Sequence, residues 1–308
     1  MLNTGRHWGV LGVPSSAGGH TPGMDLAPGA LRAAGLLAGL AASGGSVVDH
    51  GDVAGFRRVP DPSHPDRQNI GAVARVARET ASAVASIVKA NQVPLVIGGD
   101  CTVTIGVVAG MRLAAAPTAL LYFDGGPDLY TPGRIEFGNV DAMGLAHMLA
   151  IPGSDPVLTD IGGTPPLLQS QHVVLYGDAV PDNPTDLESV LMQQLALTRI
   201  QAELIHADVG GAAETAKARI EGAGDRFIVH FDVDVLGHMH MPLANMPNSD
   251  AAPLGLTVQE VITSLQIIAA SPKFAGIVLT EVNPNNAPAD DHLDRYIQMI
   301  IQGLSHVR

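Results

Sequence analysis

The sequence contains little cysteine, little charge and no long hydrophobic run. Cys101 is the one cysteine among 308 residues, which excludes an intramolecular disulfide. Charged residues make up 15% and hydrophobic residues 46%, a balance that excludes extensive disorder. No run reaches the roughly 18 apolar residues of a membrane-spanning helix, and the N-terminus lacks the apolar stretch and cleavage site of a secretory signal. We therefore expect a soluble, cytoplasmic protein.

Basic residues are also scarce. There are 17 Lys and Arg residues against 30 Asp and Glu residues, which gives a net charge of −13. This surplus of negative charge repels phosphate backbones and anionic lipids, so we expect neither nucleic acid nor a membrane as a partner. Clustered aspartates favour metal ions and small cationic molecules instead.

What is present is an alternation of short apolar runs with longer helical patterns. The runs predict strands at residues 8–13, 46–49, 94–97, 119–123, 172–176, 227–231 and 274–279. Helical patterns lie at residues 28–43, 69–91, 103–112, 186–196, 212–222, 257–271 and 290–304, with Asn69 as the cap of the second. This alternation is typical of the α/β class and predicts a three-layer α/β/α sandwich around a mostly parallel sheet. No composition shift or internal repeat divides the chain, so we expect one domain over residues 1–308.

Polar residues follow four of these strands, at the point where each strand ends. The segments are Gly98-Gly99-Asp100-Cys101, Asp124-Gly125-Gly126-Pro127-Asp128, Asp232-Val233-Asp234 and Thr280-Glu281. Ligand sites of open parallel sheets form outside the carboxyl ends of the strands. We therefore expect these side chains to meet at one edge of the sheet.

A divalent metal site is the simplest explanation for so many carboxylates at one edge. Carboxylates packed together repel one another and take up protons, whereas a bound cation keeps them ionised, and oxygen-rich sites suit Mn²⁺ or Mg²⁺. A single strand-terminal aspartate is more often a helix cap or a turn residue. The pair Asp232 and Asp234 shares a face only if the strand continues. The joint placement of the four segments favours a clustered site.

The order of these segments resembles the ureohydrolase family, which includes arginase, agmatinase and formiminoglutamase. The matching motifs are Gly12-Val13-Pro14, Ala27-Pro28-Gly29-Ala30-Leu31-Arg32, Gly51-Asp52, Gly98-Gly99-Asp100, Asp124 to Asp128, Gly138-Asn139, Phe231-Asp232-Val233-Asp234 and Glu281-Val282-Asn283-Pro284. The resemblance implies an arginase-like fold and a homo-oligomer. It also implies two Mn²⁺ ions that share a bridging hydroxide, which attacks a guanidinium carbon and releases urea.

The resemblance assigns roles to the residues at the strand ends. Asp124 and Asp232 would bridge the two metals, and Asp128 would complete one metal site. Asp234 would complete the other. Glu281 matches the acidic residue that holds the substrate guanidinium through a charge-assisted contact.

Two ligand positions depart from the family pattern, so we expect a divergent member that binds one or two Mn²⁺ ions. Cys101 replaces the histidine of the family's G-G-D-H segment and is either a thiolate ligand of the first metal or a small buried thiol. Gly126 stands where the family's Asp-Ala-His-x-Asp segment has a histidine. Because glycine offers no side-chain ligand, the second metal site is weakened.

A third departure concerns proton transfer. Asp141 stands where arginases carry a proton-shuttling histidine. It acts either as a general base or as the cap of a helix at residues 142–149. His147, His238 and His240 are other candidate shuttles, or metal ligands that replace the missing ones.

The positions that bind the substrate differ as well. Tyr130 and Phe137 replace small polar residues of the loop that grips the α-carboxylate in arginases, while Asn139 is retained. The segment Gly177-Asp178-Ala179-Val180 lacks the usual arginine and second acidic residue. We therefore expect Tyr130, Asn139 and Glu281 to bind a guanidino- or amidino-type molecule other than free L-arginine. A modified guanidine, or one attached to a larger apolar body, fits these changes.

The sequence leaves three functions open. The first is a metal-dependent hydrolase of a linear C–N bond other than a peptide bond, which releases urea or a urea-like product. The second is a non-catalytic or regulatory homologue with a mononuclear or empty metal site, and the third is a metal enzyme with different chemistry, such as amide or hydroxyguanidine hydrolysis. The joint presence of Asp124, Asp128, Asp232, Asp234 and Glu281 favours the first.

Overall fold

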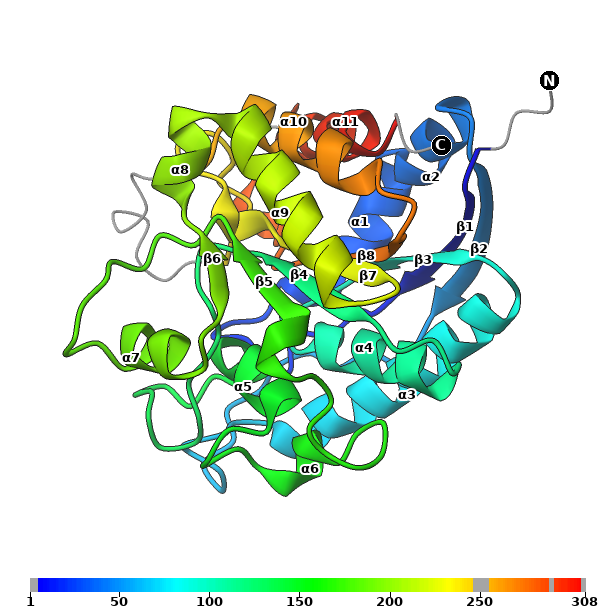
Figure 1. Cartoon of the computed structure of the whole chain (residues 1–308). Coiled ribbons are helices and arrows are strands. Elements are labelled where there is room, and N and C mark those ends of the chain that lie inside the picture. The colour runs from blue at the N-terminus through cyan, green and yellow to red at the C-terminus, as the bar shows by residue number, and fades with distance from the viewer. Residues whose placement is uncertain (1–4, 246–254, 288–290, 306–308) are drawn as a thin grey trace.

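Eight parallel strands form the centre of the molecule (Figure 1). The computed structural model of the chain describes residues 5–245, 255–287 and 291–305. The strands are β1 His7–Gly12, β2 Ser46–Asp52, β3 Val93–Ile97, β4 Ala119–Phe123, β5 Val173–Tyr176, β6 Thr198–Ile200, β7 Phe227–Asp232 and β8 Phe274–Thr280. They lie in the order β2-β1-β3-β8-β7-β4-β5-β6, and every pair is parallel.

The central strands are apolar along their whole length because both of their faces are covered. In β4, Leu121 and Phe123 pack into one hydrophobic cluster, whereas Leu120 and Tyr122 pack into the other. Successive residues of a strand point to opposite faces, so one continuous apolar run supplies both clusters.

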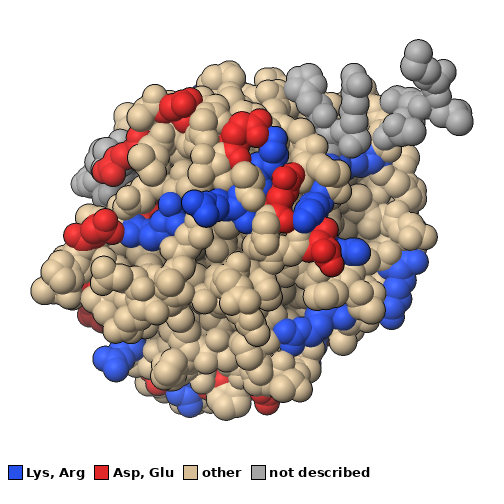
Figure 2. Space-filling model, in the orientation of Figure 1, with Lys and Arg blue, Asp and Glu red and all other residues tan. Residues whose placement is uncertain are grey.

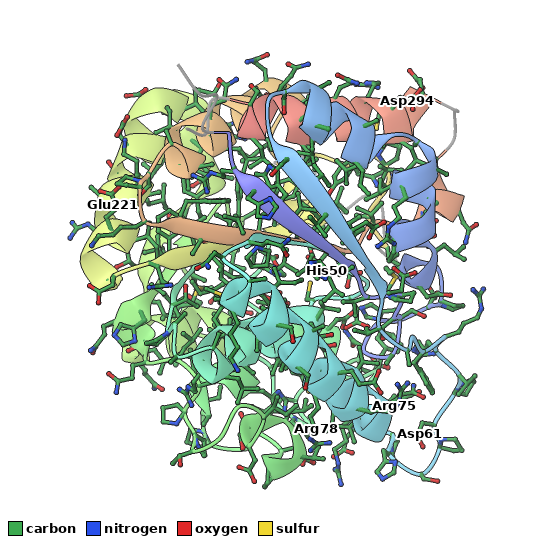
Figure 3. All side chains as sticks on the ribbon, turned by 90° about the vertical axis from the view of Figure 1, so that its right-hand side faces the viewer. His50, Asp61, Arg75, Arg78, Glu221 and Asp294 are labelled. Atoms are coloured by element: carbon green, nitrogen blue, oxygen red, sulfur yellow. The ribbon has the colours of Figure 1, made fainter. Side chains whose placement is uncertain are left out.

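Helices cover the two faces of the sheet. One layer contains α1 Ala27–Ala33, α2 Leu36–Ala42, α8 Ala202–Ala207, α9 Val209–Ala223, α10 Val258–Ala269 and α11 Asp291–Leu304. The other contains α3 Ile70–Lys89, α4 Val103–Leu113, α5 Gly144–Leu149, α6 Pro156–Thr159 and α7 Leu187–Gln194. Figure 3 faces the edge strand β2, with α11 above it at Asp294 and α3 below it at Arg75 and Arg78. The expected three-layer α/β/α architecture is confirmed.

Local differences from the expected elements have identifiable causes. The single helix expected at residues 28–43 is interrupted at Gly35, which adopts a left-handed φ of 93° between α1 and α2. Asn69 precedes α3 as expected, but its side-chain amide donates to the Val59 carbonyl oxygen at 2.9 Å instead of capping the helix. Strand β6 and helix α8 were not expected, because each is shorter than seven residues and lacks a clear periodic pattern. The expected start of the last helix at residue 290 lies outside the described residues.

The four polar segments follow neighbouring strands. Strands β3, β8, β7 and β4 are adjacent in the sheet, although β3 and β4 precede β7 and β8 in the chain by more than 100 residues. Their carboxyl ends therefore form one continuous edge at the middle of the sheet, which places the candidate site there.

Much of the acidic surplus lies inside the molecule. On the face shown in Figure 2, acidic and basic side chains are interspersed. Seven acidic side chains of the described residues are buried: Asp100, Asp124, Asp141, Asp178, Glu188, Asp232 and Glu281. Within the described part of the chain, no helix has both the length and the apolar character needed to cross a bilayer.

Candidate active site

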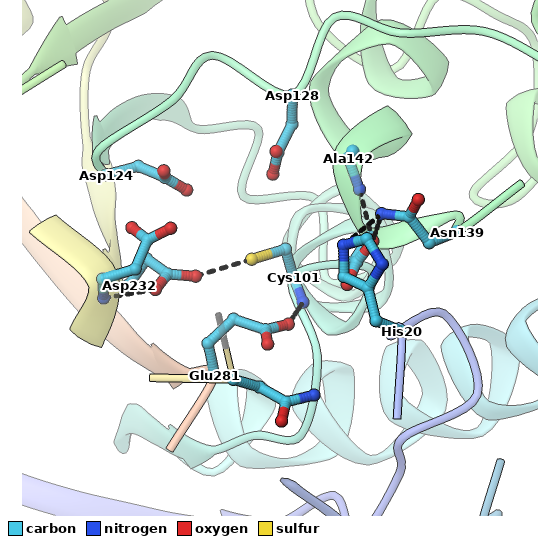
Figure 4. Close-up of a pocket in the computed structure, with 11 residues that line it drawn as sticks. His20, Cys101, Asp124, Asp128, Asn139, Ala142, Asp232 and Glu281 are labelled. Carbon is cyan, nitrogen blue, oxygen red and sulfur yellow. Dashed lines mark hydrogen bonds between the residues drawn. The ribbon is translucent and has the colours of Figure 1, made fainter. Parts of the chain in front are cut away.

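A cavity of about 200 Å³ opens at the carboxyl ends of the four central strands (Figure 4). Most of the residues predicted for the site line it: Cys101, Asp124, Asp128, Asp232, Asp234, Asn139, Asp141 and Glu281. The lining also includes His20 and Asn245, which the sequence did not indicate. Tyr130, expected to bind substrate, is not among the described lining residues; its backbone N–H donates to the Ala142 carbonyl oxygen.

Two aspartates occupy corresponding places on β4 and β7. Asp124 directly follows β4, and its Oδ1 accepts a hydrogen bond of 2.7 Å from the Gly126 N–H. Asp232 ends β7, and its Oδ1 accepts one of 2.7 Å from the Asp234 N–H. Asp234 in turn accepts from the Gly125 N–H at 3.1 Å. These bonds orient the carboxylates toward each other across the strand ends, as Figure 4 shows for Asp124 and Asp232.

Cys101 connects the end of β3 with the ends of β7 and β8. Its thiol donates to Asp232 Oδ2 at 2.7 Å, and its backbone N–H donates to Glu281 Oε1 at 3.1 Å. The buried Asp100 beside it accepts from the Gly18 N–H at 2.9 Å, so that aspartate fixes a loop instead of facing the cavity centre. Both alternatives for Cys101 therefore stay open: the thiol is buried, and it is directed at a carboxylate.

Two site residues have left-handed backbone conformations that non-glycine residues rarely adopt. Asp128 has a φ of 48° and Glu281 a φ of 61°. The Glu281 N–H donates to the Gly99 carbonyl oxygen at 2.8 Å, and the Tyr122 hydroxyl donates to Asp128 Oδ2. Such strained positions are concentrated at functional sites, where the surrounding structure holds a side chain in a required direction.

Asp141 does not cap the helix at residues 142–149. It begins a short 3₁₀ turn, Asp141–Met143, which precedes α5, and its side chain makes no capping bond. Its carboxylate lines the cavity and accepts hydrogen bonds from Asn139 Nδ2 and from the Ala142 N–H at 2.8 Å. Asn139 Nδ2 also lies 3.1 Å from His20 Nε2, so these side chains form one polar wall of the cavity.

His230 is a further residue that the sequence interpretation missed. It is fully buried in β7, and its side chain forms a compact group with Cys101, Asp124 and Asp232, whose donor atoms all lie within 4.8 Å of one another. A signal was present, because His230 precedes Asp232 by two residues and residues two apart on a strand share a face.

The other histidines considered as proton shuttles lie elsewhere. His147 is buried in α5, where its Nδ1 lies 2.7 Å from the Met143 carbonyl oxygen. Of the cavity-lining residues in the described part of the chain, His20 is the one histidine, and neither His238 nor His240 belongs to the lining.

Burial strongly affects the protonation of the site. Loss of water raises the pKa of Asp124, Asp128, Asp232 and Glu281 well above the usual range, and the neighbouring carboxylates add to this rise. Burial also raises the pKa of Asp141 to about 6. A bound divalent cation would favour the ionised forms, because its charge offsets both the burial and the mutual repulsion. The carboxylate oxygens therefore fit a metal ion.

Two sequence departures are visible in the structure. Gly126 leaves open space, since a Cβ atom built there would meet only Asp124 Oδ1, at 3.9 Å. Asp178 does not line the cavity; it is buried and forms an ion pair with the partly buried Arg199.

Comparisons with known proteins agree with this arrangement. A family model described as the arginase family matches residues 6–303. The arginase of Bacillus caldovelox is 27% identical over 288 residues, which cover 89% of this chain and 90% of that protein. Arginase-1 of Oryctolagus cuniculus is 26% identical over 307 residues, which cover 98% and 92% of the two chains. The solved structure of the Bacillus caldovelox arginase superposes with a TM-score of 0.86 at 25% identity, covering 98% of this chain and 99% of that one.

Proposed function

The chain belongs to the arginase family, and from this premise we propose that it is a metal-dependent hydrolase of a linear C–N bond in a guanidino- or amidino-type substrate. The observation that carries the proposal is the cavity lining. Six acidic side chains and one thiol surround the cavity, and the described lining contains no lysine or arginine. Such a cavity attracts cations, both metal ions and cationic groups of a small molecule.

Metal binding is assigned to the residues at the ends of β3, β4 and β7. Cys101 and Asp128 would hold one cation and Asp234 a second, with Asp124 and Asp232 shared between them. The oxygen donors suit Mn²⁺. When bound there, a divalent cation would supply a water of lowered pKa as the nucleophile. Because Gly126 supplies no side chain, we expect the second position to bind its ion more weakly.

Substrate binding is assigned to Glu281 and Asn139, which also line the cavity. Glu281 would hold the guanidinium through charge-assisted hydrogen bonds, and Asn139 Oδ1 would accept a hydrogen bond from one of its N–H groups. Water adds to the guanidinium carbon, the C–N bond to the remainder of the substrate breaks, and the amine leaves with a proton. Asp141 would accept the proton of the water and pass it to the leaving amine, so that the products are urea and an amine.

The substrate body is the least constrained part of the proposal. An α-carboxylate would need a cationic or donor-rich partner, and the lining offers His20, Asn139 and Asn245. Burial and the nearby Arg58 lower the pKa of His20, so it is a neutral partner near pH 7. Phe137 is exposed and contacts His20 edge to face, with ring centroids 6.0 Å apart. We therefore propose that guanidines without an α-carboxylate, including those with an apolar body, are preferred over L-arginine; Tyr130 would contact only the outer part of such a body.

The test is urea release by the purified protein after reconstitution with Mn²⁺, measured across a panel of guanidino compounds. The panel includes L-arginine, agmatine and guanidines with aromatic or alkyl substituents. We expect turnover with at least one cationic compound, and we expect Asp232→Asn to abolish it. Asp291→Asn is the control, because Asp291 is exposed at the start of α11. Absence of turnover with every metal and compound would leave the non-catalytic alternative as the better explanation.

A further inference from the structure

The position of His230 is unusual for a residue of the apolar core. Its ring is fully buried between Thr104 and Asp124, with Nδ1 at 2.6 Å from Thr104 Oγ1 and Nε2 at 3.1 Å from Asp124 Oδ2. Each ring nitrogen thus has a polar neighbour, one on the α4 side and one at the cavity.

His230 is one of four donor groups at one point. The others are Cys101, Asp124 and Asp232, all four side chains are buried, and their donor atoms lie within 4.8 Å of one another. Cys101 Sγ is 2.7 Å from Asp232 Oδ2 on one side, and His230 Nε2 is 3.1 Å from Asp124 Oδ2 on the other. Ligands of a tetrahedral zinc ion, at bond lengths of about 2.0–2.3 Å, lie roughly 3.3–3.8 Å apart. The group is therefore close to the size that such an ion requires.

In Asp124, Asp232 and His230, the polar atom that does not face the other three groups makes a hydrogen bond to a neighbour. The Gly126 N–H donates to Asp124 Oδ1, and the Asp234 N–H donates to Asp232 Oδ1, both at 2.7 Å. Thr104 holds His230 Nδ1. Each group thus directs one remaining donor atom at a common point, which is the arrangement that outer hydrogen bonds produce around bound metals.

We propose that Cys101, Asp124, His230 and Asp232 form a four-ligand site for Zn²⁺ or a cation of similar softness, with His230 as its imidazole ligand. The proposal rests on the proposed function only for the location of the cation. It differs from an oxygen-rich Mn²⁺ position in containing one sulfur and one nitrogen donor, which Zn²⁺ and Co²⁺ prefer over Mn²⁺.

The competing explanation is that His230 only fills the core. In that case its hydrogen bonds to Thr104 and Asp124 satisfy the ring, and the contact between Cys101 and Asp232 is a simple thiol–carboxylate hydrogen bond. In this explanation the histidine is not a ligand, and its replacement lowers metal affinity only through the lost hydrogen bond to Asp124, which His230→Gln can retain. The two explanations therefore differ in a measurable way.

The experiment uses the full-length protein freed of metal by chelation and titrated with Zn²⁺, Co²⁺ or Mn²⁺ against a competing chelator. We expect tighter binding of Zn²⁺ than of Mn²⁺ by roughly 100-fold or more. The Co²⁺ form should show the intense visible bands of tetrahedral cobalt and a thiolate charge-transfer band in the near ultraviolet. Cys101→Ser should abolish the charge-transfer band, and His230→Phe should weaken Zn²⁺ binding by roughly 100-fold or more.

His230→Phe keeps a ring that can stack on Tyr122, and His147→Phe is the matched control, because His147 is a buried histidine outside the group. If His230→Phe does not fold, His230→Gln, which retains hydrogen-bonding atoms, takes its place.

Unchanged Zn²⁺ affinity in the His230 variant, or a Co²⁺ spectrum without thiolate charge transfer, overturns the proposal. Urea release with Mn²⁺ in a protein that shows no preference for Zn²⁺ would also overturn it while leaving the proposed function intact. Zn²⁺ binding through His230 in a protein without turnover would support the site and count against the hydrolase.

Discussion

The imidazole of His230 lies parallel to the ring of Tyr122, with ring centroids 4.0 Å apart and an interplanar angle of 6°. The two residues are register partners on β7 and β4, so the sheet itself sets their stacking. The Tyr122 hydroxyl then donates to Asp128. The stacked rings of Tyr122 and His230 therefore connect the imidazole at Asp124 with the carboxylate of Asp128.

Removal of the Tyr122 hydroxyl should weaken metal binding through Asp128. In Tyr122→Phe the ring stack remains, but the buried carboxylate loses the hydrogen bond that lowers its pKa. The loss of a hydrogen bond to a charged group corresponds to roughly 1.5–3 kcal/mol, so we expect about a 10- to 100-fold weaker metal affinity near pH 7. The measurement is competitive metal titration at pH 6, 7 and 8, and the defect should shrink at high pH, where Asp128 ionises more fully. An affinity equal to that of the unaltered protein would remove Asp128 from the ligand set.

A histidine at position 126 should strengthen the second metal position. Gly126 has space for a side chain, and its backbone is not left-handed. Gly126→His would place an imidazole beside Asp124, and we expect the bound Mn²⁺ to rise from about one toward two ions per chain. Gly126→Phe is the control, because it adds a ring of similar shape without a donor atom. Elemental analysis after gel filtration gives the stoichiometry, and equal metal content in both variants would show that the imidazole does not ligate.

Asp141 should set the acidic limb of the pH–rate profile. Burial raises its pKa to about 6, so the base form is lost as the pH falls below that value. We expect Asp141→Asn to lower kcat by roughly 10²- to 10⁴-fold and to remove that limb, whereas Asp141→His should retain part of the activity. Metal content is the control and should stay the same, because the Asp141 carboxylate is held by Asn139 and Ala142 and is not among the assigned ligands. A profile unchanged in shape would assign the proton transfer to another group.

The strand-end residues could be predicted because the parallel topology places them. Each acidic segment follows a continuous apolar run, and a chain that alternates strand with helix delivers the carboxyl ends to one edge. That rule predicts Cys101, Asp124, Asp232 and Glu281 at one edge of the sheet, and all four line the same cavity. It does not depend on the order of strands in the sheet, which the sequence did not reveal.

Residues outside these segments could not be placed by the same rule. His230 lies inside an apolar run, where a histidine resembles any half-polar core residue until Asp232 and Cys101 are seen beside it. His20 reaches the cavity from the loop after β1, whose path depends on contacts such as that between Gly18 and Asp100. Of the two alternatives left open for Asp141, the helix cap is wrong, because a 3₁₀ turn and a first helical turn have similar sequence signals.

Neutralising Glu188 should stabilise the protein above pH 7 and leave it nearly unchanged at pH 5. Glu188 is buried in α7 and accepts a hydrogen bond of 2.9 Å from the Leu129 N–H. Burial, with smaller effects from Asp186 and Asp178, raises its pKa from 4.5 to about 7. The folded state thus holds this proton more tightly than the unfolded state, so its contribution to stability is complete below pH 4.5 and is lost as the pH rises toward 7.

Glu188→Gln keeps an acceptor for the Leu129 N–H but cannot ionise. We therefore expect the variant and the unaltered protein to have similar free energies of unfolding at pH 5, and the variant to be more stable at pH 8 by roughly 1–3 kcal/mol. Urea denaturation at both pH values measures the free energy of unfolding of each protein. The other titrating groups contribute equally to both proteins, so their effects cancel in the difference. Glu203→Gln, on an exposed position of α8, is the control and should show no such change with pH. A difference between variant and unaltered protein that stays constant from pH 5 to pH 8 would mean that Glu188 ionises in the folded state at its ordinary pKa.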